Sequence, residues 1–530
     1  MKRRSFLAGA ALPLAASFAG CERLEEIQGR FTGVSQQRGH LLRERKVWPA
    51  PSKVHKTRVI IAGGGVAALA AARALRLQGM DDFTLLELED VAGGNSRAGV
   101  VSGIACPLGA HYLPIPGDAA VDVQNLLEEM GLRQRVAGRW VYDERHLCHS
   151  PQERLFFSGE WQDGLLPLQG VGREALAQYQ HFAALVDQAR RSATWSIPAS
   201  TVSQSAFMRA LAGITFARYL AQHELNDPHL RWYLDYCCND DYGAGVATVS
   251  AWAGLHYFAS RHGFSAPRFE GADATESADR EGVLTWPEGN GWLTRQLTLP
   301  LEERLQTGRM VVRIAAGRQG VEVDAFNPVS QTLERWQAER CIVALPIFVA
   351  ARIVENPPEF LRQAAARTRY APWLVANIHI NAPLQDRPGA PPSWDNVIHD
   401  SAAPSAHGAS LGYVDAMHQS LQSVPGATVL THYRALGDVP QGRQLLLEKP
   451  WAEWRNVILA DLARAHPDIA AKATRIDITR YGHAMAVPVP ADSPRRPPTS
   501  TSALSFAHSD WAGYSEFEEA FTLGHRAADV

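Results

Sequence analysis

A glycine turn between an apolar strand and a helix is the feature that most limits what this chain can fold into. Residues 58–62 (Arg-Val-Ile-Ile-Ala) are typical of a buried strand, residues 63–68 (Gly-Gly-Gly-Val-Ala-Ala) form the turn, and an apolar helical pattern follows. Gly63 permits the tight turn, Gly65 lets the backbone approach a pyrophosphate, and Ala68 lets the helix pack closely on the strand. The pattern predicts a dinucleotide-binding unit in a parallel sheet.

A second predicted strand, residues 83–87, ends in the carboxylate of Glu87, 24 residues after Gly63. This spacing is close to that of the acid that binds the adenosine ribose hydroxyls in such units. An acid rather than an arginine favours an unphosphorylated ribose, and therefore FAD or NAD over NADP. The alternative, a glycine-rich turn without a ligand, leaves the acid unexplained.

The stretch from Glu87 to Asn95 contains the double glycine Gly93-Gly94 and resembles the flavin amine oxidase superfamily, which includes monoamine oxidases, protoporphyrinogen oxidases and phytoene desaturases. The resemblance implies that the cofactor is FAD and that both glycines continue the pyrophosphate site. The family usually has an arginine after the two glycines, where this chain has Asn95. The phosphate contact is therefore expected from Arg97 or from the backbone.

Further segments that resemble the family follow in its order along the chain. The resemblance implies that Gly109 belongs to a turn next to the flavin, and that Val311 or Val312 meets the adenine from a strand. Near the C-terminus it implies that Asp510 contacts the ribityl or phosphate portion. It also implies that backbone amides around Phe517 and Glu518, at the start of the last helix, face the flavin pyrimidine. Two positions that are usually glycine carry side chains here, His508 and Glu519.

The expected fold is α/β, with a Rossmann-like FAD-binding domain assembled from discontinuous segments and an α+β substrate domain. The FAD-binding domain is predicted from residues 57–115, 285–350 and 480–530, and the substrate domain from 116–284 and 351–479. Within the substrate domain, hydrophobic patterns predict helices over 174–191 and 206–223 and strands over 375–380 and 428–435.

The implied chemistry is removal of a hydride from a C–N or C–C bond of a small organic substrate, because flavin supplies the redox step and protein supplies position. His111, next to the glycine turn at Gly109, is the leading candidate for a polar group at the reaction centre. Tyr481 is a candidate for the aromatic pair that flanks the flavin in amine oxidases. The sequence has no cysteine after Cys341, which favours FAD that is not covalently bound.

Amine oxidases commonly carry a lysine on the strand that corresponds to residues 373–379, and this strand has none. Asn377 or His379 could face the flavin instead, with even odds for a residue on a strand. The run Asn239-Asp240-Asp241 could attract a cationic amine, although an exposed turn is the favoured interpretation. The substrate stays unidentified.

Two other functions remain open. One is a desaturase-like or protoporphyrinogen-oxidase-like enzyme that acts on a C–C bond and passes electrons to a membrane acceptor such as quinone instead of oxygen. The missing lysine favours it. The other is a flavin-binding envelope lipoprotein without turnover.

The N-terminus predicts export. Residues 1–20 combine a basic start, with Arg3 and Arg4 followed by Phe6-Leu7, and a short apolar run, which resembles a twin-arginine signal for folded proteins. Cys21 follows Phe-Ala-Gly in a lipobox-like context and is a candidate for lipidation. Residues 21–56 are polar and predict a tether, so the expected location is periplasmic, anchored to a membrane.

Composition argues against several other classes of function. A formal net charge of −3 and the lack of a basic block beyond the first residues argue against nucleic-acid binding. The six cysteines form no CxxC pair, and we find no histidine pair with metal-ligand spacing. We therefore expect no metal site.

Overall fold

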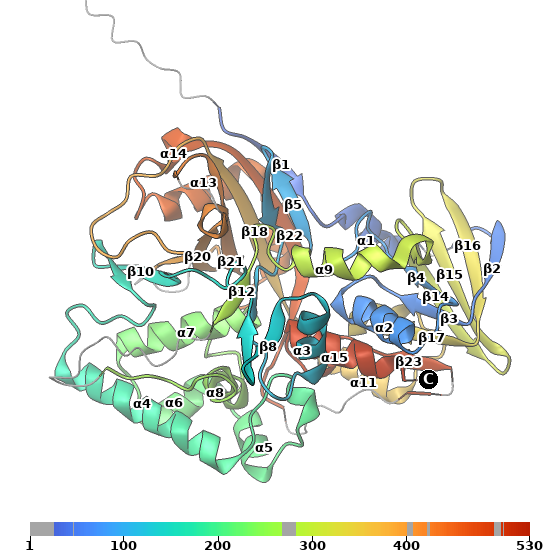
Figure 1. Cartoon of the computed structure of the whole chain (residues 1–530), viewed down its shortest axis with the longest axis horizontal. Helices are drawn as coiled ribbons and strands as arrows, with labels where there is room; N and C mark the ends of the chain where they lie inside the picture. The colour runs from blue at the N-terminus through green and yellow to red at the C-terminus, as the bar shows by residue number, and fades with distance from the viewer. Residues whose placement is uncertain are drawn as a thin grey trace, which may run out of the picture.

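The computed structural model describes residues 26–45, 47–267, 282–399, 406–420, 424–491, 500–501 and 503–529. The export signal, Arg3, Arg4 and Cys21 lie outside the described residues. The fold is mixed α/β with several sheets, and the two largest bodies stand side by side in Figure 1. The predicted fold class is confirmed.

A five-stranded parallel sheet forms the centre of the first body. Its strand order is β13-β4-β3-β17-β23, and every neighbouring pair is parallel. Alternate residues of the central strand face opposite sides, as strand geometry requires, so Val59 and Ile61 enter one core and Ile60 and Ala62 another. The strands are β13 (Leu305–Gln306), β4 (Phe83–Leu86), β3 (Val59–Ala62), β17 (Arg340–Val343) and β23 (Leu504–Phe506).

Helices cover one face of this sheet and a second sheet covers the other. The helices that share the first core are α2 (Val66–Leu77), α3 (Val121–Glu129), α9 (Gly291–Thr298) and α15 (Phe517–Ala527). The opposite core is closed by the sheet β14-β15-β16-β2 and two helices. These elements are β14 (Met310–Gly317), β15 (Gly320–Asn327), β16 (Thr332–Ala338), β2 (Lys53–Lys56), α10 (Ile347–Ile353) and α11 (Glu359–Arg367).

An eight-stranded sheet dominates the second body. Its order is β1-β22-β18-β21-β20-β19-β10-β11, and the long strands β18, β21 and β22 pair antiparallel at its centre. The strands are β1 (Gln28–Thr32), β22 (Ala473–Val487), β18 (Arg369–Ile380), β21 (Thr428–Ala435), β20 (Ala409–Asp415), β19 (Asp395–Ile398), β10 (Glu153–Phe157) and β11 (Glu160–Asp163). The boundary predicted at residue 480 falls inside β22, so the start of that segment belongs to this sheet.

Two groups of helices sandwich the large sheet. One face packs on α4 (Arg173–Ser192), α5 (Ala206–Ala212), α6 (Phe216–Gln222), α7 (Pro228–Tyr242) and α8 (Ala251–Ala259). The other packs on α12 (Gly442–Glu448), α13 (Trp451–Leu462) and α14 (Ile469–Lys472). The single helix predicted over 206–223 is wrong in detail: it is two helices, because Thr215 caps a new one by accepting a hydrogen bond from Arg218 N (3.2 Å).

The predicted tether over 21–56 is also wrong for its described part. β1 pairs in parallel with β22, from Gln28 opposite Arg475 to Thr32 opposite Thr479, and β2 pairs with β16. Between them lies α1 (Gln36–Glu44), whose N-cap Ser35 donates its backbone N–H to Glu89 (2.9 Å). Polar composition suggested a solvated linker, but a strand at a sheet edge needs only one buried face.

Three small two-stranded antiparallel sheets and a few short helices complete the described part of the chain. Two are hairpins, β5 (Ala98–Val101) with β6 (Ile104–Pro107) and β8 (Arg133–Val136) with β9 (Arg139–Tyr142), and the third pairs β7 (Tyr112–Pro114) with the distant β12 (Val283–Thr285). The short 3-10 helix η1 (Ala199–Thr201) lies in the loop between α4 and α5.

Candidate active site

Two glycine turns lie back to back at the carboxyl end of β3. Gly63 adopts φ +107°, a conformation that L side chains rarely take, and the Gly93 amide donates to the Gly64 carbonyl (2.7 Å). A Cβ atom added at Gly94 would lie 3.1 Å from the Gly65 Cα, so only glycine lets these turns approach each other. The N-terminus of α2 follows directly, and Ala68 is fully buried in the adjoining core.

Glu87 stands at the end of β4 beside these turns. It is 8% exposed, and its Oε1 accepts a hydrogen bond from the Glu89 amide (2.8 Å). Burial raises the pKa of Glu87 to about 7, against the lowering effects of the Glu89 amide and Arg97. Hydroxyl donors of a ligand would offset part of this cost of burial.

Arg97 folds back onto the second glycine turn. Its Nε donates to the Gly94 carbonyl (3.0 Å), and its Nη1 lies 3.9 Å from Glu89 Oε2. Asn95 turns elsewhere, because its side-chain amide donates to the Ala484 carbonyl on β22 (2.7 Å). Arg97, expected to contact a phosphate, brings positive charge to the glycine turns, and Asn95, which stands where the family usually has an arginine, joins them to the large sheet.

The other predicted cofactor residues are distributed around the same body. Val311 and Val312 are both buried on β14 but in different hydrophobic clusters, Val311 in the core beneath the parallel sheet and Val312 beside Phe326. Phe517 and Glu518 open α15, which packs along α2, and the first amides of a helix have no acceptor within it.

Asp510 has protein partners. Its Oδ2 accepts from the Ile347 amide (3.0 Å) and the Tyr370 hydroxyl (2.6 Å), and its Oδ1 lies 3.2 Å from His508 Nδ1. Burial alone would raise the pKa of Asp510, but His508 and these hydrogen bonds hold it below its usual value. His508, which stands where the family usually has a glycine, thus stabilises the ionised form of Asp510.

Glu519, at the second usual glycine position, turns toward the substrate domain. Its Oε2 accepts hydrogen bonds from the Ala199 amide (2.8 Å), the Ser200 amide (3.4 Å) and the Tyr514 hydroxyl (2.9 Å). It therefore links the first turn of α15 to the loop around η1. Because the side chain leaves toward that loop, it does not occupy the glycine turns.

The residues present fit an FAD molecule. The facing glycines leave a stretch of bare backbone, and a Cβ at Gly65 would meet nothing closer than 3.9 Å, so there is room for a ligand to approach. Glu87 supplies an acceptor for ribose, Arg97 a positive charge, and the amide ends of α2 and α15 further donors.

Two tyrosines of the large sheet hold the turn that was predicted to lie next to the flavin. Tyr481 donates its hydroxyl to the Leu108 carbonyl (2.7 Å), and Tyr433 donates to the Gly109 carbonyl (2.9 Å). A Cβ at Gly109 would collide with the Asn95 carbonyl oxygen, which explains the glycine. Tyr481, predicted as a catalytic aromatic, thus also positions this turn.

His111 lies in an aromatic group that we define as His111, Tyr112, Trp394 and Tyr433. Its ring stacks on Tyr433 with centroids 4.5 Å apart and lies 5.4 Å from Trp394. Burial lowers the pKa of His111 to about 3, so the ring is uncharged at neutral pH. A role for His111 at the reaction centre stays a prediction, and such a role would not involve a charged imidazole.

Asn377 points to the glycine turn from β18. Its side-chain amide donates to the Pro107 carbonyl (3.1 Å), and its oxygen accepts from Thr431 (2.8 Å). His379, two residues along, lies 2.6 Å from the Thr474 hydroxyl through Nδ1. Of the two candidates for the position of the missing lysine, Asn377 is the one that contacts the predicted flavin segment.

Asp240 and Asp395 are two acids that lie near the aromatic group. Asp240 lies in the last turn of α7, and Asp395 opens β19 directly after Trp394. Burial and then Asp241 raise the pKa of Asp240 to about 7, and burial and then Asp240 hold the pKa of Asp395 well above its usual range. Burial holds the pKa of Tyr433 high, with contributions that include both acids.

The favoured sequence interpretation of residues 239–241 as an exposed turn is wrong. Asn239 and Asp241 are buried, and Asp241 pairs with Arg261 (3.1 Å), which also pairs with Glu516 (3.0 Å). In the described part of the chain, neither Asp240 nor Asp395 forms an ion pair. Sequence reasoning missed Asp395, Trp394 and Tyr433, because single residues on separate strands carry no motif.

The described residues contain no group of three or more histidine, cysteine or acidic side chains arranged to hold a metal ion. They also contain no helix with the length and apolar character needed to cross a bilayer.

Comparison with known proteins identifies the family. The family of flavin-containing amine oxidoreductases matches residues 66–530. No curated protein matches the chain significantly. Among solved structures, putrescine oxidase bound to putrescine has 16% identity and a TM-score of 0.64, with 90% of this chain and 98% of that chain covered.

Two more solved structures share the fold. Cyclohexylamine oxidase from Brevibacterium oxydans has 18% identity and a TM-score of 0.61, with 89% of this chain and 98% of that chain covered. A fatty acid isomerase from P. acnes that produces CLA has 15% identity and a TM-score of 0.59, with 89% and 97% covered. The chain belongs to the flavin-containing amine oxidoreductase family, and it is an FAD-dependent oxidoreductase.

Proposed function

We propose that this enzyme oxidises a cationic amine whose ammonium group is held by Asp240 and Asp395. The observation that carries the proposal is a pair of half-buried carboxylates without an ion-pair partner among the described residues, next to an aromatic group. Buried charges are costly unless they are paired. A substrate ammonium would provide the missing partner, and the rings of Tyr433 and Trp394 would pack on its apolar part.

The same residues account for the proton that must leave before a C–N bond can be oxidised. When bound, FAD supplies the hydride acceptor. Asp240, with its pKa near 7, is suited to take a proton from the ammonium and leave a neutral amine. The aromatic side chains exclude water from this step, and Tyr481 and Tyr433 keep the Leu108 and Gly109 carbonyls in place.

A second candidate is oxidation of a C–C bond, with electrons passed to a membrane acceptor such as quinone. It is favoured by β18, where no lysine stands between Trp373 and His379 and Asn377 contacts the Pro107 carbonyl. The names of the structural relatives include both amine oxidases and an isomerase that acts on fatty acids. Oxygen and quinone both remain possible electron acceptors.

Anaerobic reduction of the purified holoprotein tests the proposal. The donors are putrescine, cyclohexylamine and benzylamine, compared with unsaturated ring precursors, and the readout is bleaching of the flavin absorption bands. We expect one or more amines to bleach the flavin. We also expect Asp240→Asn and Asp395→Asn to need at least about tenfold more amine for half reduction, since a lost buried ion pair is worth several kcal/mol.

The matched control is Asp118→Asn, which removes a carboxylate from an exposed position. All variants should be reduced alike by dithionite, which needs no substrate site. Reduction by ring precursors and not by amines would replace the first candidate by the second. A flavin that no donor reduces, although dithionite does, would support an envelope lipoprotein without turnover.

We propose that FAD is held without a covalent bond, by Gly63, Gly65, Ala68, Glu87, Gly93, Gly94, Arg97, Gly109, Val311, Val312, Asp510 and the amides of Phe517 and Glu518. The cysteines nearest to these segments are buried, and Cys106 has its pKa raised to about 12 by burial, which disfavours a reactive thiolate. Acid precipitation should release all flavin into the supernatant. Flavin that stays with the pellet would contradict the proposal.

We propose that the protein is exported folded by the twin-arginine machinery and anchored in the periplasm through lipid on Cys21. FAD is made in the cytoplasm, so a route for folded proteins suits a flavoprotein. Replacing Arg3 and Arg4 by lysine should leave the flavoprotein in the cytoplasm. Cys21→Ser should move it from the membrane fraction to the soluble periplasm, and an unchanged distribution would contradict lipidation.

A further inference from the structure

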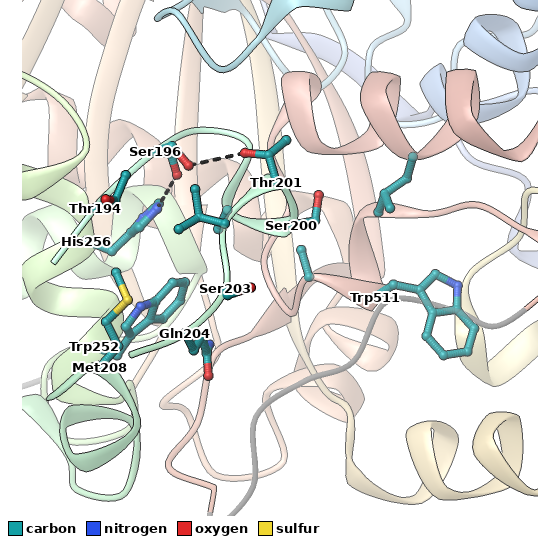
Figure 2. Close-up of a pocket in the computed structure, with 14 residues that line it drawn as sticks. Thr194, Ser196, Ser200, Thr201, Ser203, Gln204, Met208, Trp252, His256 and Trp511 are labelled. Carbon is teal, nitrogen blue, oxygen red and sulfur yellow. Dashed lines mark hydrogen bonds between the residues drawn. The ribbon is translucent and has the colours of Figure 1, made fainter. Parts of the chain in front are cut away.

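A cavity lies between the loop around η1, helix α8 and the C-terminal segment, so residues of both predicted domains line it (Figure 2). It has a volume of about 310 Å³. None of the residues that line it belongs to the aromatic group or to the two acids at the candidate active site. Its walls include Trp252, Trp511, Met208 and Leu523, which give it an apolar character on several sides.

Buried polar atoms around this cavity have no hydrogen-bond partner in the described structure. They are Trp252 Nε1, His256 Nδ1, Ser200 Oγ and Gln204 Oε1. The Trp252 and His256 side chains are more than nine-tenths buried, at 6% and 1% exposure. A buried polar group without a partner is costly, so four of them around one space indicate that something polar occupies it.

The chemistry of each atom can be assigned. His256 Nε2 lies 2.9 Å from the Ser196 carbonyl, which can only accept, so Nε2 carries the proton. Burial lowers the pKa of His256 to about 3, so the ring is neutral and its Nδ1 is an acceptor. Trp252 stacks on His256 with centroids 4.7 Å apart and offers an N–H donor. The cavity thus presents both a donor and acceptors.

Charge limits the occupant further. Among the residues that the structure describes, those that line the cavity include no lysine, arginine, aspartate or glutamate. A charged ligand would therefore lose its hydration without gaining a counter-charge. The volume equals about ten water molecules at liquid density, which is enough for a molecule with one ring. Pockets with apolar walls and a few placed polar groups are typical small-molecule sites.

We propose that this cavity binds an uncharged, planar molecule with a carbonyl and an adjacent N–H, the chemistry of an aromatic amide or a lactam. Its carbonyl would accept from Trp252 Nε1, its N–H would donate to His256 Nδ1 or Gln204 Oε1, and its ring would lie against the Trp252 indole. Glu519 connects the wall of this cavity, through the Ala199 and Ser200 amides, to the first turn of α15.

Benzamide is the probe that tests the proposal, with the holoprotein as purified. Binding is measured by titration with saturation-transfer NMR, and the position by soaking crystals. We expect saturable binding of benzamide in the cavity. Acetophenone, which keeps the carbonyl and lacks the N–H, should bind about fivefold more weakly, since one hydrogen bond is lost. Benzoate, of the same shape and charged, should bind more weakly still.

Trp252→Phe provides the matched variant. It keeps an aromatic wall and removes an N–H that has no partner in the described structure, so the fold should not suffer. Benzamide should bind this variant about fivefold more weakly. Trp140→Phe, at an indole that is 44% exposed, is the control and should bind benzamide like the wild type.

Several results would overturn the proposal. They are benzoate binding as well as benzamide, no saturable binding of benzamide, equal binding by Trp252→Phe and wild type, or crystals that show only ordered water in the cavity. None of these measurements uses an amine substrate or flavin reduction. Failure here therefore leaves the proposed amine oxidation untouched, and failure of amine oxidation leaves this site untouched.

Discussion

Gly65→Ala should weaken FAD binding without destabilising the folded protein. Gly65 precedes α2 with φ −77° and ψ −176°, which alanine adopts without strain, and its added Cβ would meet no atom closer than 3.9 Å. Alanine at an N-cap is less favourable than glycine by roughly 0.5–1 kcal/mol, and the lower entropy of the unfolded chain offsets this by about 0.4–1 kcal/mol. The flavin-free variant should therefore unfold within about 0.5 kcal/mol of the flavin-free wild type.

The affinity for FAD, in contrast, should fall. The new methyl group enters the space between the glycine turns, where the pyrophosphate is proposed to lie, and overpacking of this kind costs about 1–3 kcal/mol. The Kd for FAD should rise roughly 5- to 150-fold. The assay is titration of flavin-free protein with FAD by flavin fluorescence, beside thermal unfolding of the same samples. Gly39→Ala, with open space around its Cβ, is the control.

Two outcomes would refute this reasoning. If Gly65→Ala binds FAD like the wild type, the pyrophosphate does not lie against this backbone. If the flavin-free variant unfolds at a much lower temperature, the glycine serves the fold rather than the ligand. Gly63→Ala gives the contrast: with φ +107° and the Ala344 carbonyl in contact, that variant should lose stability even without FAD.

Three further predictions concern single side chains. The pKa of Glu87 is about 7 in the folded protein and ordinarily 4.5. Between pH 4.5 and about 7, Glu87 is therefore protonated in the folded state and ionised in the unfolded state. The stability of flavin-free wild type against urea should then fall by at most about 3 kcal/mol as pH rises across this window, and Glu87→Gln should lack this part of the slope. Because the pKa of Asp240 is about 7, amine affinity should increase up to about tenfold per pH unit as pH rises toward that value and then level off. Half-reduction titrations measure this, and a wild-type profile in Asp240→Asn would contradict the role of Asp240. Tyr481→Phe should lower stability by about 1 kcal/mol through loss of the hydrogen bond to Leu108 while FAD is retained, and loss of flavin on purification would show that the turn depends on this bond.

Local patterns allowed much of the first body to be predicted. The strand at 59–62, the glycine turn and the helix α2 are consecutive, so hydrophobic periodicity and glycine placement describe them completely. The terminal helix α15 and the strands β18 and β21 were also predicted for this reason. The family resemblance joined these separate segments into one domain.

The rest depended on contacts between residues far apart in the chain. β1 finds its partner β22 more than 400 residues later, and nothing in its polar sequence indicates that pairing. Asp241 is buried where Arg261 pairs with it and with Glu516, and Asp395 on β19 lies near enough to Asp240 on α7 for the charge of Asp240 to raise its pKa. These clusters of charged side chains form only when the sheet and the helices have packed, so residue spacing along the sequence cannot predict them.

The pairing of β1 has a geometric consequence for the whole enzyme. Gln28 is already fixed at the edge of the large sheet, opposite Arg475. If Cys21 carries the lipid, only six residues lie between it and Gln28, and the seven Cα–Cα steps of a fully extended chain span about 25 Å. The edge formed by β1 would then remain within this distance of the bilayer surface, which restricts the orientations the enzyme can adopt. Inserted residues between Cys21 and Gln28 would lengthen this reach without touching the sheet.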